Sequence, residues 1–540
     1  MTSVPADRDL FWADAVARSL PRDRPHVVHD SKTPSGTVPI SGLRGPVISD
    51  VLYRTFRASG LEVRFLYGID DMDPMDSQSM RSNEAMAPNM GKPLSAIPSP
   101  DGAASDYAAY HAGRFLSTFA DLGIHPEVYR MRDLYREGRL DDQIDLVLRR
   151  ADRVREVYRT VARVARPDDW LPVQVICENC GRVGTTYARE YDGATVAYEC
   201  LRDRKKFGRD DDLTQWAEGC GYAGRMSPFG GRAKLPWNLE WCAQWDVHGV
   251  TYEEAGKDLM TAGGSRERSD ALFRAVWEKQ PPGGLTHEFI NFGGRKMGSS
   301  TGIGAAAHDL VQVYPGEVIR FLMLRTRPQT AIDFDPGGNS LPRLMDEYDR
   351  CADAYLAEAR SGLGRIWALS QLSADPAPVP FRVRFSVVAD WVQLSRIDPA
   401  HEAEERKGSP LNDAESRDLE RRSTLAKAWL ERWAPDEARF AVAASLPDAA
   451  LGLEDAQRSF LASVADEVPR TRDPDAMQAR LYELAKQSGL VTADGRVSKD
   501  AFGAIYRAFL GRASGPRAAW FLVALDPAFA AARLREAAGR

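Results

Sequence analysis

The sequence predicts an α/β domain built on a parallel sheet, a small cysteine-containing module inserted into it, and an all-α region after it. Strand and helix patterns alternate over about the first 165 residues, five of the six cysteines lie between Cys177 and Cys242, and helical periodicity runs from about 340 to 540. Such alternation is typical of a parallel sheet covered by helices. A chain of 540 residues exceeds one hydrophobic core, so we expect roughly two to four domains.

The elements of the first half follow from apolar spacing and turn residues. They are a polar helix at 10–20, strands at 27–28 and 61–67, a long ordered loop or mobile flap at 74–105, and helices at 106–122 and 140–165. The second strand ends at an acidic run that contains Asp70, Asp71 and Asp73. These carboxylates could meet a substrate amine or ribose hydroxyls, or form a solvated turn.

Short β-like runs with cysteines and glycines begin at about residue 170. We therefore expect the α/β domain in two parts, residues 1–170 and 237–335, around an inserted module at 171–236. The remaining residues, 336–540, form the helical region, with loops expected at 371–385 and 399–415.

The net charge and the distribution of apolar residues restrict which partners we expect for this protein. The net charge is −6 and the pI about 5.9, so a nucleic-acid partner would need a local basic face. The N-terminal stretch carries acids and has no apolar core of a signal peptide, and the sequence has no run of 18 apolar residues. We expect a cytoplasmic protein without a membrane partner, and a monomer.

A turn rich in Pro, Gly and Ser, from Thr33 to Gly45, connects the first strand to helical spacing that starts at Val47. Such a turn aims backbone N–H groups and a helix N-terminus at a ligand above the strand, commonly a phosphate. A plain strand–helix connection is the alternative interpretation.

A second glycine-rich stretch, Asn291 to Gly302, combines basic residues with hydroxyls. Lys296 or Arg295 could stabilise charge on a departing pyrophosphate during in-line attack on an α-phosphate. A surface turn without ligand is the alternative.

Cysteine spacing indicates a metal site. Cys177 and Cys180 form a Cys-x-x-Cys-Gly knuckle, Cys220-Gly221 resembles half of a second, and Cys200 lies between them. Four thiolates suit a structural zinc ion with tetrahedral geometry. A buried or degenerate site without metal is the alternative.

The two glycine-rich stretches together resemble the signatures of class I aminoacyl-tRNA synthetases. Residues 34–42, PSGTVPISG, resemble the first signature, and residues 296–300, KMGSS, resemble the second, the KMSKS loop. The closest family is the class I lysyl-tRNA synthetases. Further stretches similar to that family are 91–94, 97–98, the Cys177–Cys180 knuckle, 231–237, 256–258, 263–265, 325–328 and 511–517.

This resemblance implies a Rossmann-type (HUP-like) catalytic domain, a zinc-bearing insertion and a C-terminal helical cage that reads the anticodon. It implies activation of lysine by ATP with Mg²⁺ to an adenylate, followed by transfer to tRNA. The implied catalytic residues are Lys296, Arg295, Ser299 and Ser300; the ATP-binding residues are Ser35, Gly36, Pro39, Ser41, Gly42, Met297 and Asp258; the amino-acid-binding residues are Ser31, Thr33, Trp237, Leu259, His287 and Asp70; the metal ligands are Cys177, Cys180, Cys200 and Cys220.

Departures from the family pattern concentrate at the chemistry. Pro39 stands where the family has a histidine that contacts phosphates, and Ser41 stands where it has a glycine. Proline donates no hydrogen bond from its side chain or its backbone. Gly298 and Thr301 replace a serine and a lysine of the second signature. In the amino-acid pocket the altered positions are Ser31, Leu259 and His287.

Three functions fit this pattern. The first is a ligase that activates lysine or a related amino acid and transfers it to tRNA. The second is a repurposed paralogue that forms an amide with a small, non-tRNA acceptor. The third is a non-catalytic protein that binds tRNA or a ligand. Retained Lys296, Lys257, Asp258, Trp237 and Thr33 favour the first.

Overall fold

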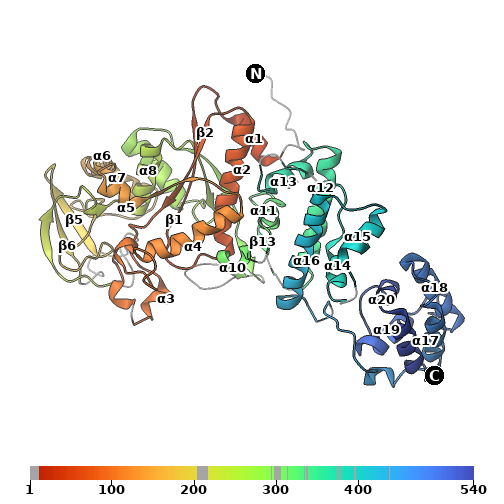
Figure 1. Cartoon of the computed structure of the whole chain (residues 1–540). Coiled ribbons are helices and arrows are strands. Elements are labelled where there is room, and N and C mark those ends of the chain that lie inside the picture. Colours follow the sequence, from red (N-terminus) through yellow and green to blue (C-terminus); the bar gives the residue numbers. More distant parts are fainter. Residues whose placement is uncertain are drawn as a thin grey trace. The chain divides into compact units, whose positions relative to one another are not determined.

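The computed structural model describes residues 11–539 apart from 85, 203–216, 293–294, 297–305, 313, 334, 336–337, 374–375, 378, 395–396 and 437. The chain divides into two compact units. One comprises residues 1–334 and 354–376, and the other comprises 335–353 and 377–540. The sheets belong to the first unit (Figure 1).

A five-stranded parallel sheet forms the centre of the first unit, as the sequence predicts. Its order is β10-β9-β1-β2-β3, made of β1 (His26–Lys32), β2 (Val63–Ile69), β3 (Glu127–Arg130), β9 (Tyr252–Gly256) and β10 (Gly283–His287). The chain moves outward in one direction from β1 to β3 and in the other from β9 to β10. The order therefore reverses between β1 and β9, and open α/β sheets bind ligands at the carboxyl ends of strands at such a reversal.

Helices cover both faces of this sheet. The helices α2 (Arg44–Ala58) and α4 (Tyr107–Asp121) pack on one face, where the Tyr67 ring of β2 lies 5.0 Å from that of Phe119. The helix α8 (Trp237–His248) packs on the other, where the Trp241 indole donates to Glu253 of β9. Successive strand residues point to opposite faces. Glu253 therefore faces α8, and Glu254 faces α2.

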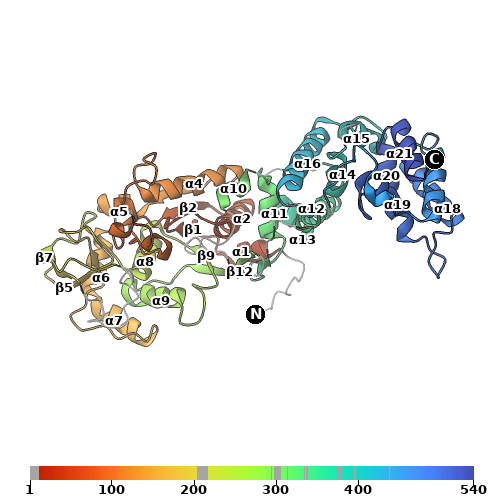
Figure 2. The ribbon, with the colours of Figure 1, turned by 90° about the horizontal axis from the view of Figure 1, so that it is seen from below.

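The remaining helices of the first unit surround this core. They are α1 (Trp12–Ser19), α3 (Gln78–Arg81), α5 (Met131–Arg136), α6 (Asp141–Arg149), α7 (Ala151–Thr160), α9 (Ser265–Leu272), α10 (Ala307–Val311), α11 (Gly316–Leu324) and α13 (Gly362–Ser370). Figure 2 shows α10 beside α4. The predicted helix at 106–122 is α4, which the Asp106 carboxylate caps by accepting from the N–H of Ala109 at 2.7 Å. No described helix has both the length and the apolar character to cross a bilayer.

The cysteine-rich stretch forms short antiparallel sheets. The strands β5 (Thr186–Tyr191), β6 (Val196–Cys200) and β7 (Ala223–Met226) make one, and β4 (Gln174–Val175) pairs with β8 (Ala233–Lys234). Its buried side chains, such as Tyr187 and Val196, join the same hydrophobic core as those of α6 to α9. The stretch is thus packed against the α/β domain.

A third small sheet carries the second glycine-rich stretch. The strand β11 (Ile290–Phe292) pairs antiparallel with β12 (Arg295–Lys296) and parallel with β13 (Ile332–Asp333). Of this stretch the structure describes Asn291 in full and the backbone alone of Phe292, Arg295 and Lys296. Met297, Ser299 and Ser300 lie outside the described residues.

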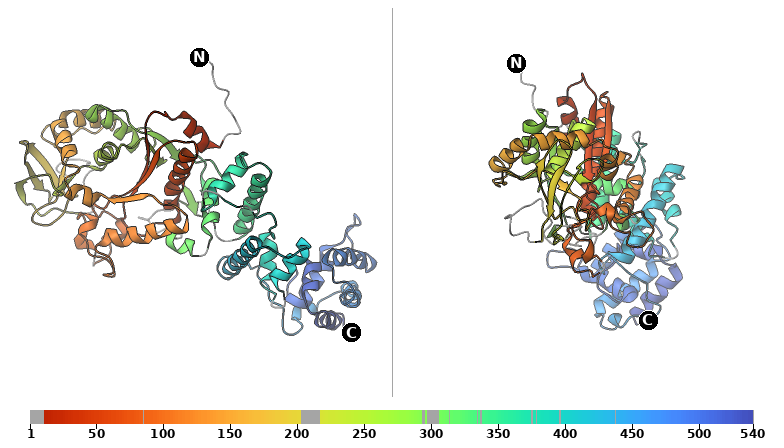
Figure 3. Two further views of the ribbon diagram at one scale, coloured as in Figure 1. Left: turned by 45° about the horizontal axis from the view of Figure 1, so that its top comes forward. Right: turned by 90° about the vertical axis from the view of Figure 1, so that its left-hand side faces the viewer.

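The second unit is helical in the part that the structure describes (Figure 3). Its helices are most of α12 (Ser340–Ala357), then α14 (Phe385–Trp391), α15 (Pro399–Lys407), α16 (Asp413–Arg432), α17 (Asp455–Glu467), α18 (Pro474–Gln487), α19 (Lys499–Leu510), α20 (Ala518–Ala524) and α21 (Pro527–Ala537).

The loop predicted at 399–415 is wrong, because α15 occupies most of it. Asp398 caps this helix by accepting from the N–H of Ala400 at 3.0 Å, and Pro399 fits its first turn. The capping box of Asn412 and Glu415 then starts α16. Polarity around 399–415 reflects exposed helix faces.

Arg44 anchors the N-terminus of α2 through its side chain. Its buried guanidinium donates to the carbonyl oxygens of Glu288, Pro328 and Thr330 at 2.7, 3.0 and 2.8 Å. Burial lowers its pKa to about 10, so it stays charged at neutral pH. Arg44→Leu removes a charged donor from all three carbonyl oxygens, although Pro328 still accepts from the N–H of Glu288 at 2.8 Å. A buried acceptor left without a donor costs about 1–3 kcal/mol. We expect a loss of roughly 3–5 kcal/mol in the free energy of unfolding.

Urea unfolding followed by circular dichroism measures this loss. The matched control is Arg57→Leu, an exposed arginine on the same helix, which should change stability by less than about 0.5 kcal/mol. Equal stability of the two variants would contradict the anchoring role of Arg44.

Candidate functional site

A cavity of about 450 Å³ lies at the carboxyl edge of the parallel sheet, beside the reversal between β1 and β9. Its lining comes from the β1–α2 turn, the ends of β2, β9 and β10, and the start of α8. Such a position is where ligands bind in open α/β sheets.

Eleven residues that the sequence singles out line this cavity: Ser31, Thr33, Ser35, Pro39, Ser41, Gly42, Asp70, Trp237, Asp258, Leu259 and His287. Gly36 is buried in the same turn without lining the cavity. The structure thus brings together residues more than 250 positions apart in the chain. That they bind ATP and an amino acid stays a prediction.

The β1–α2 turn ends in a 3-10 helix, Ile40–Leu43, which leads directly into α2. Pro39 is its N-cap, and the carbonyl oxygen of Pro39 accepts from the N–H of Gly42 at 2.9 Å. The positive end of the helix dipole therefore lies at the cavity wall. Gly45 lets α2 approach closely, because a Cβ there would lie 2.7 Å from Glu254 Oε1 and 2.9 Å from Asp30 Oδ2.

Asp70 faces the cavity as an acceptor. Its Oδ2 accepts from the Ser31 hydroxyl at 2.9 Å, and its Oδ1 accepts from the Gln244 amide at 3.1 Å. Burial and then repulsion from Asp73 raise the pKa of Asp70 to about 6. The carboxylate is mostly ionised at neutral pH and is suited to an ammonium group.

A buried ionic network supports this wall. The Thr33 hydroxyl donates to Asp73 Oδ2 at 2.7 Å, and the Lys234 ammonium pairs with Asp73 and, at 3.0 Å, with Glu240. The Tyr135 hydroxyl donates to Glu240 at 2.7 Å. In the sequence Lys234 belongs to the family-like stretch 231–237, but its ionic role was not predicted.

Glu253 and Glu254 are adjacent on β9 and have separate partners on the two faces of the sheet. Glu253 accepts from Trp241 Nε1 at 2.9 Å and lies 2.7 Å from His29 Nδ1. Glu254 lies 2.9 Å from His287 Nε2. The sequence analysis missed both glutamates; two successive acids at the end of a strand are the signal that could have revealed them.

Asp30 is a further acid that the sequence analysis missed. Its Oδ1 accepts from the N–H of Ser31 at 2.7 Å, whereas its buried Oδ2 has no hydrogen-bond partner among the described residues. Burial, followed by repulsion from Glu254 and Glu253, raises its pKa well above the ordinary value. Burial thus favours the neutral form of the Asp30 carboxyl group, which lies beside Glu254 on the α2 side of the cavity.

The four predicted metal ligands converge. The Sγ atoms of Cys177, Cys180, Cys200 and Cys220 all lie within 4.8 Å of one another. Those of Cys177 and Cys220, and those of Cys180 and Cys200, are 3.7 Å apart.

Cys200 and Cys220 form a second knuckle that repeats the hydrogen bonds of the first. The N–H of Gly181 donates to the Cys177 carbonyl at 2.8 Å, and the N–H of Gly221 donates to the Cys200 carbonyl at 2.8 Å. Both glycines have positive φ, 71° and 81°. Two residues separate the cysteines of the first knuckle, whereas residues 201–219 separate those of the second. The longer gap is why the sequence spacing concealed the similarity.

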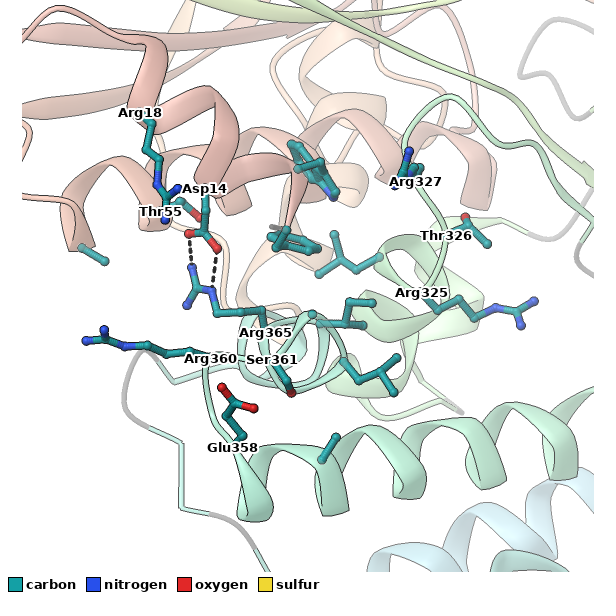
Figure 4. Close-up of a pocket in the computed structure, with 18 of the residues that line it drawn as sticks. Asp14, Arg18, Thr55, Arg325, Thr326, Arg327, Glu358, Arg360, Ser361 and Arg365 are labelled. Carbon is teal, nitrogen blue, oxygen red and sulfur yellow. Dashed lines mark hydrogen bonds and ion pairs between the residues drawn. The ribbon is translucent and has the colours of Figure 1, made fainter. Parts of the chain in front are cut away.

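A larger cavity, of about 1,770 Å³, lies elsewhere in the first unit (Figure 4). Its charged lining residues are Arg18, Arg325, Arg327, Arg360 and Arg365 against Asp14 and Glu358. Arg365 pairs with Asp14 at 2.8 Å. The family-like stretch 325–328 contributes to this cavity, whose net positive charge suits an anionic ligand.

Known proteins resemble the chain over its length. The family model for tRNA synthetases class I (K) matches residues 10–373. Lysine--tRNA ligase 1 of Methanosarcina acetivorans is 31% identical over 98% of this chain and 98% of its own. The lysine--tRNA ligase of Archaeoglobus fulgidus is 30% identical over 98% of this chain and 100% of its own. A solved glutamate tRNA ligase from Elizabethkingia meningosepticum aligns with 96% of this chain and 99% of its own, at a TM-score of 0.41 and 10% identity.

The carboxylate of Glu254 favours protonation of the His287 imidazole. Burial alone would lower the pKa of His287, but attraction to Glu254 and a hydrogen bond with it outweigh burial and raise the pKa above its ordinary value. Glu254→Gln removes the attraction and leaves the burial, so we expect the pKa of His287 to fall below its ordinary value.

NMR titration of the histidine C–H signals, with His287→Gln to assign the resonance, measures this pKa. Glu62→Gln, at an exposed glutamate of the same unit, is the matched control and should leave the pKa in place. An unchanged pKa in Glu254→Gln would show that the carboxylate does not hold the imidazolium.

Proposed function

Because the chain belongs to the family of tRNA synthetases class I (K), we propose that it activates lysine with ATP and Mg²⁺ and transfers the lysyl group to tRNA. In the first step a lysine carboxylate oxygen attacks the α-phosphorus of ATP, and pyrophosphate leaves. In the second step a hydroxyl at the 3′ end of tRNA attacks the acyl carbon of the lysyl-adenylate, and AMP leaves. The protein contributes positioning and charge stabilisation to both steps.

The cavity at the strand reversal is the observation that carries this proposal. It gathers Asp258 and Ser41, predicted for ATP, beside Trp237 and Asp70, predicted for the amino acid. A buried carboxylate with hydrogen bonds to Ser31 and Gln244 is suited to a substrate ammonium, and Trp237 is suited to an alkyl chain. The bonds to Ser31 and Gln244 hold the Asp70 carboxylate in one orientation before substrate arrives.

The altered signatures do not change the choice of function, because the curated relatives that match nearly the whole chain are named lysine--tRNA ligases. The changes predict a slower first step. Loss of one donor to the transition state typically costs about 10²–10³ in rate. Formation of an amide with a small acceptor, and binding without catalysis, are outcomes that the experiment below separates.

Lysine-dependent exchange of pyrophosphate into ATP tests the proposal. We expect exchange with lysine and little with norleucine, which lacks the terminal amine. Asp70→Asn should lower exchange by about tenfold to a hundredfold, since an ionic hydrogen bond is lost. Asp152→Asn, at an exposed aspartate of the same unit, is the control.

Each outcome of that assay has a distinct meaning. Exchange with lysine followed by charging of tRNA supports the proposal. Exchange without charging of tRNA indicates a small acceptor. Absence of exchange that persists in Pro39→His with Ser41→Gly and Leu259→His would identify a non-catalytic relative.

We also propose that residues 171–236 are an inserted module held by a structural zinc ion. Four thiolates around zinc at about 2.3 Å lie about 3.8 Å apart, close to the 3.7 Å separations in the cluster. The Cys220 N–H and the Thr185 hydroxyl lie 3.3 and 3.2 Å from the Cys200 sulfur. Such contacts orient a ligand and stabilise a thiolate. Zinc would link the two knuckles and supply no catalysis.

Metal analysis tests the zinc ion. We expect about one zinc per chain by mass spectrometry, a lower melting temperature after chelation, and loss of metal in Cys200→Ser. Cys351→Ser removes a buried cysteine outside the cluster and should keep the metal. A metal-free protein whose stability does not respond to a chelator would contradict the proposal.

A further inference from the structure

Lys32 ends β1 and lines the cavity. It follows Asp30 by two residues, so its side chain leaves the sheet on the face that α2 covers. Its carbonyl oxygen accepts from the N–H of Asp70 at 3.1 Å, which fixes its backbone against the end of β2. The half-buried side chain thus starts at the strand reversal.

Acidic side chains dominate the cavity wall. The acids among the lining residues are Asp30, Asp70, Glu253, Glu254, Asp258 and Glu288, and Lys32 is the one Lys or Arg among the described lining residues. Glu253 pairs with His29, Glu254 with His287 and Glu288 with Lys257. A polyphosphate entering this cavity would be repelled unless a cation met it.

The ammonium of Lys32 lies within electrostatic reach of the other three acids. Burial lowers the pKa of Lys32, and attraction to Asp30, then Asp258, then Asp70 opposes this effect. No described residue forms a hydrogen bond or ion pair with the Nζ atom. Asp258 is predicted to bind ATP and Asp70 the amino acid. Lys32 therefore lines the same cavity as one residue of each expected subsite.

We propose that Lys32 is a catalytic residue whose ammonium binds the α-phosphate of ATP, in place of the donor that Pro39 cannot supply. The inference rests on the proposed function. In this step the O–P bond to lysine forms, the bond from the α-phosphorus to the bridging oxygen breaks, and pyrophosphate leaves with the electron pair. Lys32 stays protonated throughout and stabilises the charge on the phosphorus centre.

Binding of AMP and adenosine to the full chain, measured by calorimetry, tests this role without requiring turnover. The two ligands differ in the α-phosphate alone. We expect the wild-type protein to bind AMP more tightly than adenosine. Lys32→Met should weaken AMP by about tenfold to a hundredfold and leave adenosine within about twofold. Retained adenosine binding also reports that the variant is folded.

Two further variants complete the test. Lys32→Arg keeps the positive charge and should retain most of the preference for AMP. Lys279→Met removes an exposed lysine of the same unit that pairs with Asp246, and should behave as wild type. In pyrophosphate exchange, Lys32→Met should lower the rate by about 10²–10³.

The outcomes distinguish this inference from the proposed function. An unchanged preference for AMP in Lys32→Met, or equal losses of AMP and adenosine, would overturn the role of Lys32 even if wild type activates lysine. A lost preference for AMP in a protein without exchange would keep Lys32 as a phosphate ligand and reject the proposed function.

Discussion

The close approach of the α2 N-terminus to the carboxylates of β1 and β9 is the constraint on which the site depends. Gly45 leaves no room for a Cβ beside Glu254 and Asp30, and Arg44 ties the same turn to the carbonyl oxygens of Glu288 and Thr330. The positive end of the helix dipole then faces an acidic wall. This arrangement fixes the β1–α2 turn and the ends of β9 and β10 as one rigid frame.

The two faces of the sheet differ in how the buried acids of this frame are partnered. On the α8 side, Glu253 is fully engaged by His29 and the indoles of Trp241 and Trp245. On the α2 side, Asp30 Oδ2 has no hydrogen-bond partner among the described residues. A buried polar group without a hydrogen-bond partner is costly. A binding site can hold such groups, because a substrate can supply the missing partner and recover the cost.

Local sequence patterns predicted the main elements of the site, whereas tertiary contacts bring its remaining residues together. The glycine-rich turn, the first two strands and the Cys177–Cys180 knuckle follow from spacing within a few residues, whereas Cys200 and Cys220 are separated from that knuckle by long gaps. The edge strand β3 was not predicted, because it is short and Val128 is 46% exposed. Glu253, Glu254 and Lys32 were missed as site residues for another reason. A charged residue at a strand end usually faces water, and only the strand order shows that these three face one cavity.

Pro39, which stands where the family's first signature has a histidine, fits the backbone of this turn. The replacement therefore affects the chemistry of the turn and not its fold. Pro39 has φ −75° and ψ 168°, an extended conformation that proline adopts readily, and it precedes a helix whose first N–H groups have no intrahelical acceptor. A missing N–H at this position therefore removes no helical hydrogen bond. Proline at Pro39 changes only what the cavity can donate to a ligand. A cation from the adjacent strand end can replace a lost donor without any change in the fold, and Lys32 is placed to do so.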